Sequence, residues 1–136
     1  GALNVNVFCG YALRASADGT LVDPRNLNFG DTFVIFREGD EFLHRVRSRA
    51  ERDGLRLQTG IVEYVDQAKP HGTMGPFRKF SSFAYQSEFR FVIEPGTGAP
   101  RSLRLGGLTD IAIVGSSAKL NERFRFQEGQ LSFRAT

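Results

Sequence analysis

Residues 84–94, A-Y-Q-S-E-F-R-F-V-I-E, alternate between apolar and polar side chains and decide the fold. Side chains in a β-strand point to opposite faces in turn, so this spacing predicts one strand with one buried face. The predicted buried row is interrupted only by the small Ser87 and consists of Tyr85, Phe89, Phe91 and Ile93.

The opposite face of this strand carries Gln86, Glu88 and Arg90 on successive positions. Same-face neighbours on a strand are about 7 Å apart. An amide, a carboxylate and a guanidinium are therefore expected in a row on a rigid element, with Lys79 a short distance upstream. These four residues are the candidate site.

Composition indicates one α+β domain over residues 1–136. The 18 basic and 15 acidic residues are interspersed and give a net charge of +3, which does not favour a nucleic-acid partner. No apolar run reaches membrane-spanning length and no signal peptide is visible, which predicts a cytoplasmic protein without a membrane partner. The chain begins Gly-Ala without Met, and we expect it to be excised from a longer chain whose N-terminal segment is missing.

Metal-ligating residues are scarce. The single cysteine, Cys9, lies in an apolar run and is predicted to be buried, and it leaves no partner for a disulfide. The two histidines, His44 and His71, have no metal-binding spacing. The sequence therefore predicts neither a metal site nor a bound cofactor.

Residues 38–53 change to a helical period and form the one main helix that the sequence predicts. Asp40 is a candidate N-cap and Gly54 the stop. The face expected to pack on the sheet consists of Phe42, Leu43, Val46 and Ala50. The arginines expected in water are Arg45, Arg49 and Arg52. This arginine run is either a solvated face or a phosphate-binding patch.

The rest of the chain favours short strands, so the expected fold class is β-dominated α+β with mostly antiparallel sheets and a split β-core. The predicted strands are residues 4–9, 32–37 with both faces covered, 55–66 with a possible joint at Gly60, 102–105 and 110–114. A short helix over residues 116–122 and a Phe-rich hairpin that turns at residues 128–129 complete the prediction. The loop at residues 67–76 is expected to be a lid over the site.

The Q-x-E spacing of Gln86 and Glu88 is the arrangement that mono-ADP-ribosyltransferases use on a strand. There the carboxylate stabilises the positive charge that develops as nicotinamide leaves, and the residue two before it orients the acceptor. Any strand can carry this spacing by chance. The alternative is a solvated face with an ion pair between Glu88 and Arg90 that contributes little stability.

The chain also resembles a bacterial and phage family of unknown function. The shared elements are N-V-F-C, I-V-E-Y-V-D, the motif K-x-x-x-F-x-Y-Q-x-E-F-R and L-T-D-I-A-I-V-G, over about residues 5–120. It departs from that family in lacking an aromatic-rich N-terminal segment and in having Phe83 where Trp is usual. The family is distantly similar to the ADP-ribosyltransferase fold.

Two hypotheses follow. The first is an enzyme-like domain of conflict systems, a toxin or defence protein, that handles NAD as a substrate or another nucleotide. Its catalytic residues would be Glu88 and Gln86. Its substrate-binding residues would be the anion binders Lys79 and Arg90, with Tyr11 and Arg14 as a nucleotide clamp. The second hypothesis is a non-catalytic binding or assembly module, in which the polar strand and the Phe-rich hairpin contact a protein partner.

Overall fold

The computed structural model describes residues 4–13, 22–127 and 130–133. The strands in this part of the chain are β1 (Asn6–Tyr11), β2 (Thr32–Phe36), β3 (Arg56–Ile61), β4 (Glu63–Val65), β5 (Arg78–Phe80), β6 (Glu88–Glu94), β7 (Ala112–Ser116), β8 (Phe124–Gln127) and β9 (Gln130–Phe133). The helices are α1 (Gly39–Arg52), α2 (Leu120–Arg123) and the 3₁₀ segments η1 (Pro24–Phe29), η2 (Ser81–Gln86) and η3 (Ser117–Lys119).

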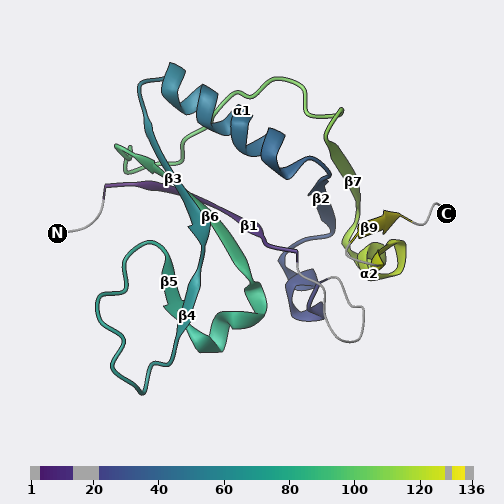
Figure 1. The fold of residues 1–136 in the computed structure, drawn as a ribbon, viewed down its shortest axis with the longest axis horizontal. Helices are drawn as coiled ribbons and strands as arrows, with labels where there is room; N and C mark the ends of the chain where they lie inside the picture. Colours follow the sequence, from purple (N-terminus) through teal and green to yellow (C-terminus); the bar gives the residue numbers. More distant parts are fainter. Residues whose placement is uncertain (1–3, 14–21, 128–129, 134–136) are drawn as a thin grey trace.

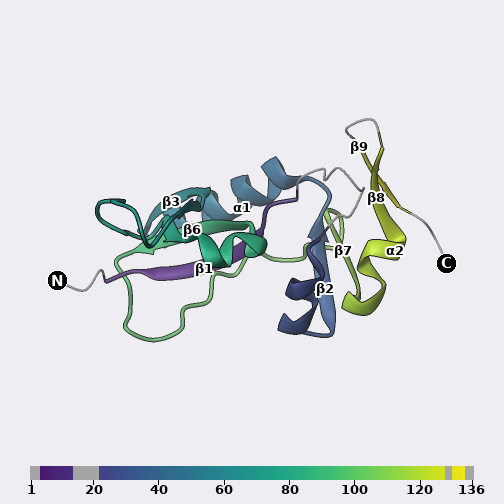
Figure 2. The ribbon, with the colours of Figure 1, turned by 90° about the horizontal axis from the view of Figure 1, so that it is seen from below.

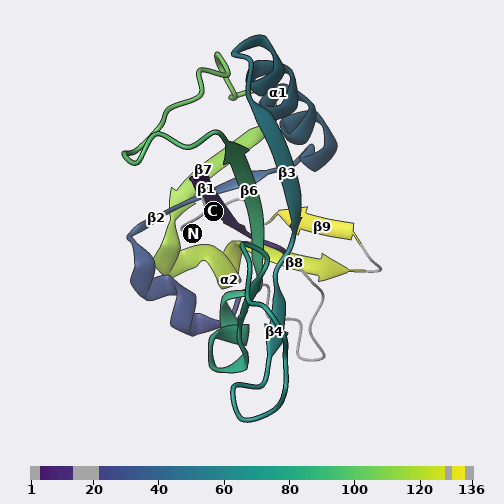
Figure 3. The same cartoon turned by 90° about the vertical axis from the view of Figure 1, so that its left-hand side faces the viewer.

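The sheets are mostly antiparallel, and the predicted α+β class is confirmed. The largest described sheet has the order β1-β6-β3, with β6 in the centre and both pairings antiparallel. Figure 3 shows β6 and β3 side by side. Two more antiparallel pairs are β2-β7 and β8-β9, whereas β4 and β5 are parallel. In Figures 1 and 2 the β2-β7 pair stands beyond the carboxyl end of β1.

Helix α1 packs across one face of the β1-β6-β3 sheet (Figure 1). Its buried residues Phe42, Val46 and Ala50 recur every four positions, as the sequence predicts. The Phe42 ring meets Phe91 of β6 edge to face, with the ring centroids 5.7 Å apart. Phe91 and Ile93 are buried as predicted, but Val92 on the opposite face is also buried, so the prediction of only one buried face is wrong. Burial of these side chains is the main force that holds α1 on the sheet.

The start of α1 differs from the prediction, whereas its end at Gly54 agrees with it. The N-cap is Glu38, and Asp40 lies inside the first turn, where a carboxylate is favoured by the helix dipole. The chain leaves the helix through Gly54, whose φ of 73° suits glycine. The prediction that the arginines of this helix lie in water is partly wrong. Arg45 forms ion pairs with Glu41 and Asp110 and its side chain is only 23% exposed.

Other predictions are corrected by the way the strands pair. Strand β2 is not covered on both faces, because Phe33 is buried whereas Val34 is 53% exposed. The break in residues 55–66 falls at Val62 rather than Gly60. Residues 102–105 form no strand, since they have no partner strand and instead pack Leu103 and Leu105 on the core as a loop.

The C-terminal predictions are partly tested. Residues 117–123 form η3 and α2, as expected for the short helix, and β8 pairs with β9 as the predicted hairpin. The turn itself, at residues 128–129, lies outside the described residues. None of the helices in the described ranges is both long and apolar enough to cross a membrane.

Candidate functional site

Glu88 is the first residue of the central strand β6, and two backbone hydrogen bonds fix its position. Its N–H donates to the hydroxyl oxygen of Tyr64 at 2.9 Å. Its carbonyl accepts from the N–H of Val62 at 2.9 Å. Only 9% of the residue is exposed, so this carboxylate lies in the protein rather than on a solvated face.

Two cations hold the Glu88 carboxylate. Lys79 Nζ donates to Oε1 at 2.8 Å, and Arg90 Nε donates to Oε2 at 2.8 Å. Burial would raise the pKa of Glu88, but the hydrogen bonds and charges of Lys79 and Arg90 lower it below its ordinary value. Glu88 is therefore a partly buried carboxylate that stays ionised at neutral pH.

Gln86 reaches the same cluster by a route that the sequence does not predict. It lies in η2, and Ser87 follows in the left-handed region with φ 41°, so residues 84–94 are not one strand. Gln86 and Glu88 therefore do not share a strand face. They are brought together because Lys79 Nζ donates to Gln86 Oε1 as well as to Glu88.

Contacts with distant segments explain why the alternating pattern fails before Glu88. The N–H of Ala12 donates to the carbonyl of Ser87 at 2.7 Å, and Ser87 Oγ donates to the carbonyl of Ala12 at 3.1 Å. Asn26 Nδ2 donates to the carbonyl of Tyr85 at 2.8 Å. These bonds satisfy the backbone around η2 without a strand partner.

Arg90 and Lys79 also connect the cluster to its surroundings. Arg90 Nη1 donates to the carbonyl of Pro76 at 2.8 Å, so the loop at residues 67–76 ends against this cluster. Lys79 Nζ lies 4.8 Å from the ring centroid of Phe83, within the range of a cation–π contact. That the loop closes over a ligand stays a prediction.

Tyr11 lies opposite Glu88 on β1, and its hydroxyl oxygen accepts a hydrogen bond from the N–H of Asp23 at 3.4 Å. Arg14 lies outside the described residues. Cys9 pairs with Arg90 and is exposed, which corrects the predicted burial, because β1 is an edge strand. Partial burial and the nearby Glu88 carboxylate raise the pKa of the Cys9 thiol, which disfavours the nucleophilic thiolate.

A cavity of about 980 Å³ adjoins the cluster. Residues 8–13 form one wall with Gln86 and Glu88, and β2, η1 and the start of α1 contribute the others. This volume is in the range of small-molecule sites. Glu88 thus contacts two cations and also lines a largely apolar cavity.

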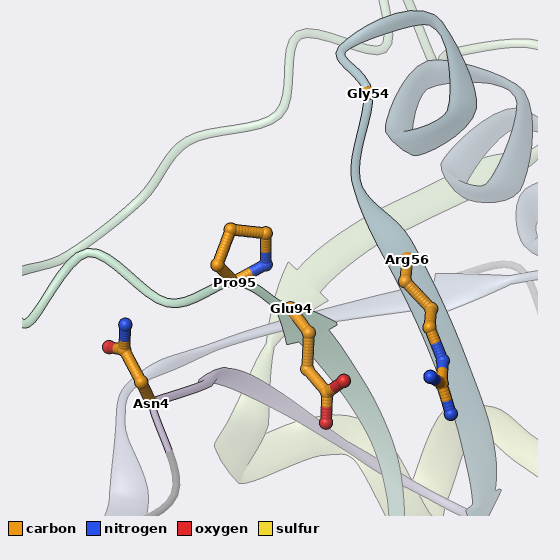
Figure 4. Close-up of a pocket in the computed structure, with 5 residues that line it drawn as sticks. All are labelled: Asn4, Gly54, Arg56, Glu94 and Pro95. Atoms are coloured by element: carbon orange, nitrogen blue, oxygen red, sulfur yellow. The ribbon is translucent and has the colours of Figure 1, made fainter.

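A second pocket, of about 470 Å³, lies at the far end of β6 (Figure 4). It is lined by Asn4, Gly54, Arg56, Glu94 and Pro95. Glu94 pairs with Arg56 on the neighbouring strand, and no ion pair to Glu94 occurs among the described residues. Among all the residues that the structure describes, no three His, Cys, Asp or Glu side chains are grouped so that they could hold a metal ion.

Tyr64 and Pro76 are site residues that reasoning on the polar strand missed. Tyr64 contributes a hydroxyl from β4, and Pro76 a backbone carbonyl from a loop. The tyrosine of I-V-E-Y-V-D is a polar aromatic residue in a predicted strand, which is a weak indication that its hydroxyl belongs to the site. A loop carbonyl has no signal in the sequence.

Comparison of the chain with protein-family models, with curated proteins and with solved structures found no match. The function is therefore argued from the geometry of the site.

Proposed function

We propose that this chain is an enzyme-like domain that handles NAD or another nucleotide, with Glu88 as the group that stabilises developing positive charge. The observation that carries the proposal is the place of Glu88, which two cations hold ionised in the wall of a cavity of about 980 Å³. A carboxylate that the protein holds in a fixed position stabilises a cationic transition state without having to reorganise.

The reaction that fits is cleavage of an N-glycosidic bond. The bond between C1′ of the ribose and the ring nitrogen breaks, and its electron pair leaves with the base. The positive charge that this leaves on the sugar is stabilised by the Glu88 carboxylate. Water or an acceptor hydroxyl then bonds to C1′ and loses its proton, which gives hydrolysis or ADP-ribosyl transfer.

The other predicted residues have supporting parts in this proposal. Gln86 would orient the acceptor, and its amide is held by Lys79 and by the Tyr85 hydroxyl. Tyr11 contributes to the cavity wall beside Glu88. Lys79 and Arg90 keep Glu88 ionised, and their spare N–H groups would meet the phosphates. Toxin or defence activity is the setting that the family resemblance suggests.

The test is incubation of the chain with NAD and other nucleotides, with release of the free base followed by mass spectrometry and binding by thermal shift. We expect Glu88→Gln to abolish release, because it keeps the shape of the side chain and removes its charge. Glu94→Gln is the matched control, since it makes the same change on the same strand away from the cavity. Equal turnover by the wild type and Glu88→Gln would refute the proposal.

A second candidate is the protein-binding module. Val34 of β2 and Val114 of β7 are cross-strand partners, and they are 53% and 62% exposed. Exposed apolar pairs of this kind occur at interfaces. If no nucleotide stabilised the chain, this candidate would replace the first.

A further inference from the structure

The wall of the cavity beside β1 is mainly apolar and rich in aromatic rings. Eight aromatic residues line it, among them Phe8, Phe33 and Phe91, and aliphatic side chains fill much of the rest. Aromatic rings pack well against other rings, in offset or edge-to-face contacts. The surface therefore suits a flat ring rather than a hydrated, flexible group.

The charges in this wall have one sign. Among the described residues that line the cavity, Asp40 and Glu88 are the only charged ones, and no Lys or Arg is present. A phosphate or carboxylate inside the cavity would meet these two carboxylates, whereas Lys79 and Arg90 contact Glu88 from outside the described wall. Like charges placed together in this way weaken binding.

The cations nearest to the cavity are directed elsewhere. Lys79 donates to Glu88 and Gln86, and Arg90 donates to Glu88 and to the carbonyl of Pro76. Neither residue lines the cavity. The wall therefore presents the Glu88 carboxylate to a ligand without presenting a cation.

The Glu88 carboxylate still has capacity to accept hydrogen bonds. Each of its oxygens accepts one bond from a cation, whereas a carboxylate oxygen has two acceptor sites. A ligand group that contacts this carboxylate is therefore favoured if it is a donor, such as a hydroxyl or an N–H.

We propose that the cavity beside β1 binds an aromatic ring that carries a hydrogen-bond donor and no anionic group, and that phosphate and carboxylate groups stay outside it. This rests on the proposed function for the identity of the whole ligand, since a nucleotide would then place its base inside and its phosphates at the mouth. The preference against an anionic group depends only on the wall itself.

The test uses two probes with the same ring, indole-3-ethanol and indole-3-acetate, titrated into the full chain by calorimetry. We expect the neutral alcohol to bind about tenfold or more tightly than the anion, because only the anion brings a negative charge to the carboxylates of the wall. Equal affinities, a tighter acetate or no binding of either probe would overturn the inference.

The variant Gly10→Leu tests whether indole-3-ethanol binds in this cavity. Gly10 lines the cavity, and a Cβ there would meet only the carbonyl of Phe89 at 3.9 Å, so the new side chain can extend into the hollow. We expect this variant to lose indole-3-ethanol binding. Gly107→Leu is the matched control, because a Cβ at Gly107 meets nothing within 4 Å and the residue does not line the cavity. Unchanged binding in a folded Gly10→Leu variant would place the probe elsewhere and overturn the inference.

Two further results separate the proposals. Glu88→Gln should narrow the difference between the two probes, and this holds even if Gly10→Leu does not fold. A nucleotide screen run beside the probes tests the proposed function alone. If the probes behave as expected and no nucleotide binds, the proposed function fails and the ring site stands. If nucleotides bind but the acetate is preferred, the ring site fails.

Discussion

Two charged clusters in this molecule have the same composition with the signs reversed. In one, the carboxylate of Glu88 lies between Lys79 and Arg90. In the other, the guanidinium of Arg45 on α1 lies between Glu41 and Asp110, with N–O distances of 2.9 and 2.6 Å. Both are three-charge clusters with good geometry, so distances alone do not tell a site from a surface feature.

The difference lies in what surrounds each cluster. Glu88 is buried and adjoins a large cavity, whereas Glu41 and Asp110 are largely open to solvent, with side chains 45% and 60% exposed. Water screens the second cluster, so its ion pairs add little to stability. In the first, loss of Glu88 leaves two partly buried cations without the anion that they share. The comparison predicts a descending series of effects.

The largest effect is expected from Glu88→Ala. The change removes the shared anion and leaves Lys79 and Arg90 facing each other. Breaking a buried ion pair from one side typically costs about 3–5 kcal/mol of the free energy of unfolding. Urea denaturation measures this loss. A loss below about 1 kcal/mol, the level of an exposed pair, would mean that water reaches the cluster freely.

Much of this fold could be predicted because it depends on local patterns. The period of Phe42, Val46 and Ala50 identifies α1 and its buried face, and the alternation of Phe89 to Ile93 identifies the apolar face of β6. These patterns reflect burial of one face, which each segment carries in its own sequence.

The residues of the site could be predicted from the sequence, but their arrangement in space could not. Gln86 and Glu88 belong to one cluster, yet they meet through Lys79 rather than on one strand face. The turn at Ser87 depends on bonds from Ala12, 75 residues away. Tertiary contacts of this kind override the local preference for a strand, and a short sequence pattern does not predict them.

An intermediate loss of stability is expected when the pH is lowered. The pKa of Glu88 is lowered in the folded chain from its ordinary value of 4.5, so the unfolded chain takes up this proton more readily. The stability that Glu88 contributes is therefore present above pH 4.5 and is lost as the pH falls below it. Urea midpoints at several pH values should show the wild type and Glu88→Gln converging in acid.

Glu94→Gln is the control for this convergence, because it removes a carboxylate from the same strand that neither Lys79 nor Arg90 contacts. Its midpoint should follow that of the wild type across the range. A gap between the wild type and Glu88→Gln that stays constant down to acid pH would show that Glu88 contributes through packing rather than through its charge.

The smallest effect is expected from Arg45→Met. Methionine keeps much of the apolar stem that lies along α1 and removes the charge that joins Glu41 to Asp110. The hydrogen bond with Asp110 is the main cause that raises the pKa of Arg45 and that lowers the pKa of Asp110. Even so, both carboxylates regain water when the guanidinium is lost, and salt screens what remains. The urea midpoint should therefore lie close to that of the wild type, and added salt should narrow any difference. A loss as large as that of Glu88→Ala would show that ion-pair geometry, rather than burial, sets the strength of both clusters, and the contrast on which the candidate site depends would fail.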